Sequence, residues 1–120
     1  MKNHDQELAK ALYSVLFGIE TEWDLTPEVF ASLLHVSEKT YIEWKNSKEV
    51  ELNSEGAYRR VLDFIDFYDT VSSFFASVSD QVGFLNAPGS TFNYNSPFEL
   101  IKENFQNIHV VNCYFTRFRN

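Results

Sequence analysis

Apolar residues near the start of the chain recur at spacings of three and four, which places them on one side of a helix. Acidic residues stand ahead of this run, where the positive end of a helix dipole favours them. The pattern predicts an amphipathic first helix. Its buried stripe is expected to consist of Leu8, Leu12, Val15, Leu16 and Ile19.

Two further helix starts follow. Thr26-Pro27 pairs an N-cap residue with a proline at the first helical position, ahead of the apolar segment PEVFASLL. Ser37 is an N-cap for the segment SEKTYIEWK. Because only His35-Val36-Ser37 separates the two segments, we expect two short helices joined by a tight turn, as in a helix-turn-helix motif.

In such a motif the first residues of the second helix enter a DNA groove. Glu38 and Glu43 would repel phosphate there, so a helix-turn-helix that serves only as a scaffold is an equally good interpretation. If DNA is bound, the candidate contact residues are Ser37, Lys39, Thr40 and Lys45.

A longer apolar stripe begins after a polar connection and predicts a central helix from Ser54, its cap, to about Ser79. The stripe is wide, because phenylalanines flank it on both sides. A face of this width buries against its own chain and against a second copy, so we expect a homodimer.

The segment FLNAPGSTFNYNSPFELI holds two prolines around an uncharged loop. The residues from Phe84 to Pro88 are typical of a helix end. Ser96-Pro97 is typical of a helix start, with Glu99 in the first turn, and the helix is expected to reach Asn104. The loop therefore joins two helices and shapes a surface between them.

The last segment, NIHVVNCYFTRF, has the spacing of a helix and the β-branched and aromatic content of a strand. We favour the helix. The expected fold is then all-α, with a helix-turn-helix bundle in residues 1–53. Residues 54–120 supply the long central helix and a small helical C-terminal lobe that binds a partner.

Charge is distributed unevenly along the chain, whose net charge is −7. Residues 100–120 carry three basic groups and one acidic group, whereas the rest of the chain is acidic. Aromatic and arginine side chains are enriched at binding hot spots, so this end is a candidate partner surface. The alternative is that its aromatics close the core. The candidate residues are Phe98, Tyr114, Arg117, Phe118, Arg119 and Asn120.

Candidate catalytic and metal-ligating groups are scattered. His109 and Cys113 are four residues apart, but two ligands fall short of the three or four that a zinc site needs. Asp63, Asp66 and Asp69 drift around a helix, with no second acidic cluster to face them. We therefore expect no enzyme, no metal and no cofactor.

The chain begins without an apolar segment after a basic one, and it has no run of about 18 apolar residues. It carries one cysteine, which fits a reducing compartment. These features predict a cytoplasmic protein that does not enter a membrane.

The two blocks of the proline-containing segment resemble a motif of the Xre/MbcA/ParS-type antitoxins. Phe84-Leu85 matches a Trp-Leu pair in that family, Pro88 matches its first proline, and Ser96 to Ile101 match its Ser-Pro-Leu-Glu-Leu-Leu block. In order and spacing, the resemblance covers roughly residues 25 to 118.

The resemblance implies an antitoxin that neutralises a RES-domain toxin, an enzyme acting on NAD, by direct complex formation. It also implies that a dimer can bind operator DNA and repress its own operon. In that case the toxin is the partner of the C-terminal lobe. A DNA-binding regulator whose C-terminal lobe only dimerises is the alternative, and a small enzyme ranks third.

Overall fold

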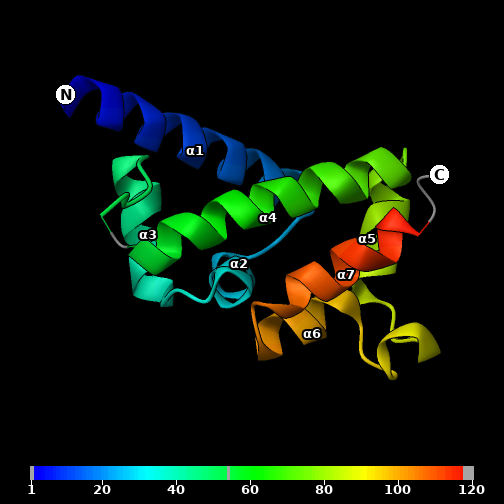
Figure 1. Ribbon diagram of the computed structural model, residues 1–120. Coiled ribbons are helices and arrows are strands. Elements are labelled where there is room, and N and C mark those ends of the chain that lie inside the picture. Colours follow the sequence, from blue (N-terminus) through cyan, green and yellow to red (C-terminus); the bar gives the residue numbers. More distant parts are fainter. Residues whose placement is uncertain (1, 54, 118–120) are drawn as a thin grey trace. The chain divides into compact units, whose positions relative to one another are not determined.

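The computed structural model describes residues 2–53 and 55–117, and these form seven α-helices and no β-strand (Figure 1). The prediction of an all-α fold is therefore confirmed for the described residues. A short 3-10 helix, η1, interrupts the loop after the fifth helix. The elements are α1 (Lys2–Glu22), α2 (Pro27–Leu34), α3 (Glu38–Ser47), α4 (Glu55–Phe74), α5 (Val78–Asn86), η1 (Ser90–Phe92), α6 (Pro97–Glu103) and α7 (Asn107–Thr116).

The chain divides into two units, Met1–Ile65 and Asp66–Asn120, here called unit 1 and unit 2. The division falls inside α4, whereas the sequence suggested a boundary at residue 53, in the loop that precedes this helix.

The buried face of α1 is rotated from the predicted stripe. Leu8 and Val15 are 40% and 42% exposed, so their assignment to the core is wrong. Ala9 and Tyr13, on the other side of the stripe, are buried instead, with exposed fractions of 5% and 7%. The buried residues of α1 are Ala9, Leu12, Tyr13, Leu16, Ile19 and Glu20.

Aromatic rings fill the core of unit 1. The ring of Phe30 lies 5.4 Å from that of Tyr41 and 5.3 Å from that of Phe64, measured between centroids. Trp23, just beyond α1, meets Phe64 edge-on at 6.2 Å. Edge-on and tilted geometries suit the charge distribution of aromatic rings, so α1, α2, α3 and the first half of α4 share one core.

The central helix is shorter than predicted. It ends at Phe74, because Ser77 caps a new helix by accepting a hydrogen bond from the Asp80 backbone N–H at 3.1 Å. The side chain of Gln81 donates to the Phe75 carbonyl at 2.8 Å and so replaces a partner that the broken helix no longer supplies. The predicted cap at Ser54 lies outside the described residues.

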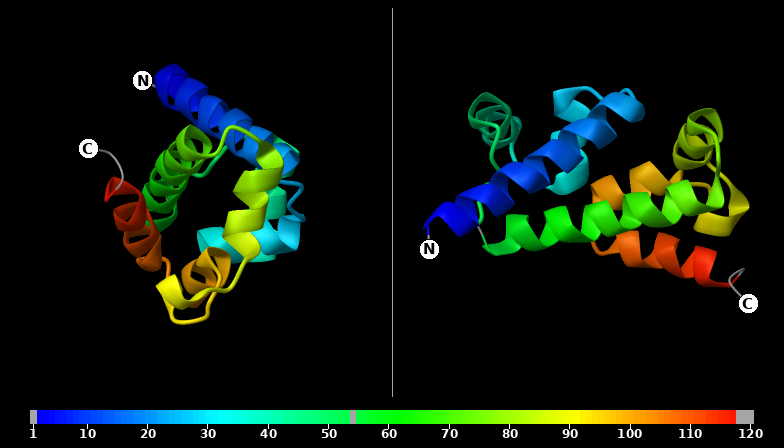
Figure 2. Two further views of the ribbon diagram at one scale, coloured as in Figure 1. Left: turned by 90° about the vertical axis from the view of Figure 1, so that its right-hand side faces the viewer. Right: turned by 90° about the horizontal axis from the view of Figure 1, so that it is seen from above.

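In unit 2, helices α5, α6 and α7 gather around the end of α4, with α6 packed against its neighbours α5 and α7 (Figure 2). The predicted start at Ser96 is confirmed as a reciprocal capping box: Glu99 N–H donates to Ser96 Oγ at 3.1 Å, and Ser96 N–H donates to Glu99 Oε1 at 2.8 Å. The last segment is a helix, as favoured, and it buries Ile108, Val111 and Phe115.

No helix in the described part of the chain is both long enough and apolar enough to span a bilayer.

Candidate functional site

A left-handed residue joins α2 to α3. His35 has φ 57°, a conformation in which glycine is usual and histidine is tolerated. Arg60, from the first half of α4, donates through Nε to the Leu34 carbonyl at 2.7 Å and through Nη2 to the His35 carbonyl at 3.0 Å. No local sequence pattern predicts these two bonds, because Arg60 follows the turn by 25 residues.

The start of α3 uses two of the predicted DNA-contacting hydroxyls in its own cap. Ser37 Oγ accepts from the Thr40 backbone N–H at 3.0 Å and donates to Thr40 Oγ1 at 2.9 Å. Lys39 is exposed. Among Ser37, Lys39 and Thr40, Lys39 is therefore the residue that presents a charge to solvent.

The fourth predicted residue, Lys45, joins a largely buried polar cluster. Its Nζ lies 2.9 Å from Glu20 Oε2, and the Tyr41 hydroxyl donates to Glu20 Oε1 at 2.6 Å. Burial, reinforced by this hydrogen bond, raises the pKa of Tyr41 well above its usual value, so the phenol stays a donor. Glu20 was missed, although a carboxylate among the apolar residues of α1 signals a buried partner.

The exposed side of α3 borders an acidic groove of about 440 Å³. Three glutamates face it, and no lysine or arginine is among the described residues that line it. A duplex laid along this side would bring phosphates close to carboxylates, which opposes binding. The lining residues are Thr40, Glu43, Trp44, Ser47, Glu49, Val50 and Glu51.

The second candidate site is an aromatic pocket of about 210 Å³ in unit 2. Tyr114 of α7 stacks on Phe84 of α5 at a centroid distance of 5.9 Å and meets Phe92 of η1 at 5.5 Å. Residues from both blocks of the proline-containing segment therefore surround one cavity. It is lined by Phe84, Ala87, Pro88, Gly89, Thr91, Phe92, Pro97 and Tyr114.

The loop beside this aromatic pocket presents Tyr94, which is 75% exposed. Asn93 and Tyr94 both have positive φ, 57° and 67°, and the Tyr94 N–H donates to the Gly89 carbonyl at 2.7 Å. Two consecutive non-glycine residues in this region cost free energy that the surrounding contacts must offset. The loop thus holds a large aromatic side chain in solvent at some energetic cost.

The predicted partner-binding residues fall into three groups. Phe98 is 4% exposed and lies in the core of unit 2. Tyr114 is half-buried at the aromatic pocket, and Arg117 is exposed at the end of α7. Phe118, Arg119 and Asn120 lie outside the described residues. Tyr94, at the loop tip, was not among the candidates, although an aromatic residue in a polar loop could have indicated it.

The scattered candidate ligands do not assemble in the described part of the chain, where no three His, Cys, Asp or Glu side chains come together to hold a metal ion. His109 and Cys113 are both exposed on α7. No protein-family model matches this chain, and no curated protein is significantly similar to it.

Proposed function

We propose that this protein is an antitoxin that neutralises a RES-type, NAD-consuming toxin by direct complex formation through unit 2. It acts without a cofactor or chemistry of its own, as a homodimer in the cytoplasm. It can in addition repress its own operon.

One observation carries the proposal: the two antitoxin-like sequence blocks and the predicted contact Tyr114 meet at the aromatic pocket. Phe84 lines it from the last turn of α5, Pro88 from the loop after that helix, and Pro97 from the start of α6. Tyr94 stands exposed in the loop between the blocks. Tyrosine combines a large apolar surface with a hydroxyl, which makes it a frequent anchor in protein interfaces.

Co-expression with a neighbouring RES-domain toxin, followed by co-purification and measurement of cellular NAD, tests the proposal. Wild type should co-purify with the toxin and preserve NAD. Tyr94→Ala should weaken the complex by about tenfold or more, because losing a central aromatic anchor costs on the order of 2 kcal/mol. Val110→Ala is a matched control, since Val110 is 52% exposed on α7 and distant in sequence from the loop.

Removing residues 116–120 separates the loop from the basic chain end. Lost neutralisation by a folded truncation would assign the main contact to the chain end, which holds Arg117. Retained neutralisation would assign it to the loop from Gly89 to Asn95. If wild type fails to bind any neighbouring toxin, the antitoxin proposal is wrong.

A DNA-binding regulator is the second candidate, and the clamped turn between α2 and α3 favours it. The three-residue turn and the caps at Thr26 and Ser37 have the form of a helix-turn-helix motif. The acidic groove beside α3 opposes it, so we expect weak operator binding that falls steeply with salt. Tight, selective binding that survives Lys39→Ala with Lys45→Ala would contradict that expectation.

A further inference from the structure

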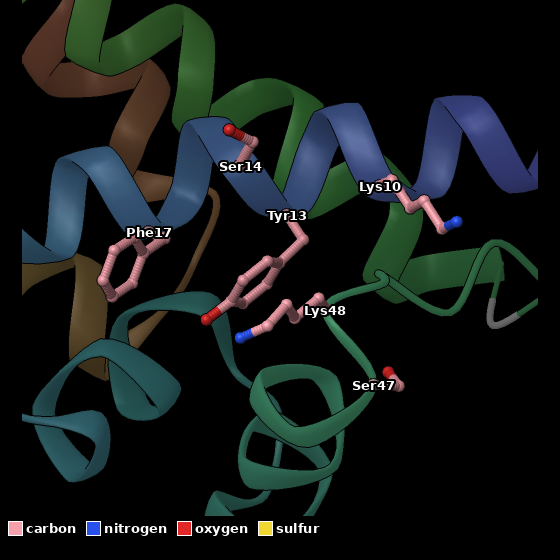
Figure 3. A pocket seen from close by; sticks show the side chains of 6 residues that line it. All are labelled: Lys10, Tyr13, Ser14, Phe17, Ser47 and Lys48. Atoms are coloured by element: carbon pink, nitrogen blue, oxygen red, sulfur yellow. The ribbon is translucent and has the colours of Figure 1, made fainter.

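Helix α1 and the residues at the end of α3 enclose a groove of about 630 Å³ in unit 1 (Figure 3). Helix α1 forms one side of it, and the turn around Lys48 forms the other. We call this the lysine groove. Its lining residues are Lys10, Tyr13, Ser14, Phe17, Ser47 and Lys48.

Backbone hydrogen bonds fix the two walls of the lysine groove. The Val50 N–H donates to the Ala9 carbonyl at 3.1 Å, which ties the segment after α3 to α1. Lys48 takes a left-handed conformation, with φ 60°, and its N–H donates to the Trp44 carbonyl at 2.7 Å. The backbone on both sides of the groove is thus held by hydrogen bonds within unit 1.

The groove combines an apolar surface with cations. Tyr13 and Phe17 stack with their ring centroids 6.2 Å apart, and Phe17 remains 49% exposed. Lys10 and Lys48 are exposed at its edges. An exposed aromatic ring that shares a groove with two ammonium groups suits a ligand that carries both an apolar group and negative charge.

The charge of the groove contrasts with that of the surrounding sequence. Residues 1–53 hold ten acidic and five basic groups, yet the groove has two lysines and no acid among its described lining residues. A third lysine, Lys45, lies with its Nζ 5.5 Å from the Phe17 ring centroid, but Glu20 balances its charge. Lys10 and Lys48 therefore supply the charge available to a ligand.

We propose that the lysine groove binds a short acidic segment of a partner protein. An aliphatic or aromatic side chain of that segment packs on Phe17, and carboxylates further along the segment pair with Lys48 and Lys10. The volume lies within the range of about 300–1,000 Å³ that is usual for specific ligand sites. Ser14 and Ser47 add hydroxyls that can hydrogen-bond to the backbone of the segment.

Nucleic acid fits this surface less well than a short peptide does. Ser47 borders both the lysine groove and the acidic groove. A long polyanion that extends from the lysine groove past Ser47 therefore meets Glu43, Glu49 and Glu51 in the acidic groove. A peptide with two or three carboxylates ends before that point. The neighbouring acids thereby select a short, locally charged ligand.

Fluorescence polarisation with the full chain tests the proposal. The probe is a labelled octapeptide with three Asp or Glu residues around a Leu and a Phe, and the reference peptide has Asn and Gln in place of the acids. The acidic probe should bind saturably and the neutral one should not. Lys10→Gln with Lys48→Gln should weaken binding by about tenfold. Lys39→Gln with Lys102→Gln, an equal loss of charge at exposed sites elsewhere, should change it less than twofold.

Amide shifts in NMR spectra locate the probe. Changes confined to residues near Lys10, Phe17 and Lys48 support the proposal. Five outcomes would each overturn the proposal. They are no binding of the acidic probe, equal weakening by the control variant, chemical-shift changes in other parts of the chain, tighter binding of a single-stranded oligonucleotide, and self-association through this groove. The outcome is independent of toxin neutralisation, which is assigned to unit 2, so either proposal can fail alone.

Discussion

Aromatic rings pack in the core of both units, but the units differ in the polar bonds inside each of them. Unit 1 ties its helices with polar groups from distant parts of the sequence: Glu20 bonds to Tyr41 and Lys45, and Arg60 bonds to the turn before α3. In unit 2 the rings cluster around Phe115, whose centroid lies 5.2 Å from that of Phe84 and 4.6 Å from that of Phe74. Directional polar bonds specify how helices are oriented, whereas ring packing tolerates exposed aromatic edges that a partner can use.

The largest expected effect comes from removing a ring at the centre of unit 2. Phe115→Ala deletes a side chain that is 1% exposed, and we expect the free energy of unfolding to fall by about 3–5 kcal/mol. Urea unfolding measures the loss. Hydrogen exchange by mass spectrometry should show faster exchange in α5, α6 and α7 before α2 and α3; uniform acceleration would mean that the two units unfold as one.

A smaller effect is expected from the polar cluster of unit 1, and it depends on pH. Because burial and the bond to Glu20 raise the pKa of Tyr41, the folded chain keeps a proton that the unfolded chain releases above about pH 10. The stabilisation is therefore complete below about pH 10 and declines as pH rises further.

Tyr41→Phe should lower the free energy of unfolding by about 1–2 kcal/mol at pH 8, since it removes a hydrogen bond to a charged group. It should also flatten the decline between about pH 9 and 11. Urea titrations of both proteins across this range measure the slope. An unchanged slope would show that other groups cause the alkaline loss.

The N-caps at Ser96 and Ser37 allow a direct comparison of a buried and an exposed cap. Ser96→Ala should cost about 1–2 kcal/mol, because Ser96 is 4% exposed and its loss leaves the Glu99 N–H poorly satisfied. Ser37→Ala removes an equivalent bond at an exposed helix start and should cost about 0.5–1 kcal/mol. Thermal unfolding followed by circular dichroism ranks the two, and the reverse order would contradict this account.

The smallest effect is expected on the exposed side of α1. Leu8→Gln should change the free energy of unfolding by less than about 0.5 kcal/mol, because Leu8 is 40% exposed. Leu16→Ala, at a fully buried position of the same helix, should cost about 2–5 kcal/mol. A large loss from Leu8→Gln would indicate that this side of α1 is covered by a second copy.

Local signals predicted much of the fold. The caps at Thr26, Ser37 and Ser96 each start a helix as expected, because an N-cap bond involves residues only three apart in the chain. The end of α4 was misplaced, since an apolar stripe continues through the serines around Ser77 that break the helix. Periodicity reports which residues are apolar, not where a competing cap interrupts them.

The candidate sites were less predictable than the helices. The cluster around Glu20 and the pairing of Arg60 with the α2–α3 turn join residues more than 20 apart in sequence. Tyr94 gave only a weak signal, because its exposure depends on two left-handed residues in a row. The lysine groove combines Lys10 with Lys48, and no local pattern brings these two together.

Arg60 also bears on how helix pairs of this kind are found. Sequence searches for such motifs place weight on a glycine in the turn, since glycine adopts the left-handed conformation at least cost. Here a guanidinium from α4 bonds to the carbonyls of Leu34 and His35, and the turn forms without glycine. The bonds that hold this turn therefore come from another helix. A search for an arginine at this distance after a non-glycine turn is expected to detect helix pairs that a search for glycine passes over.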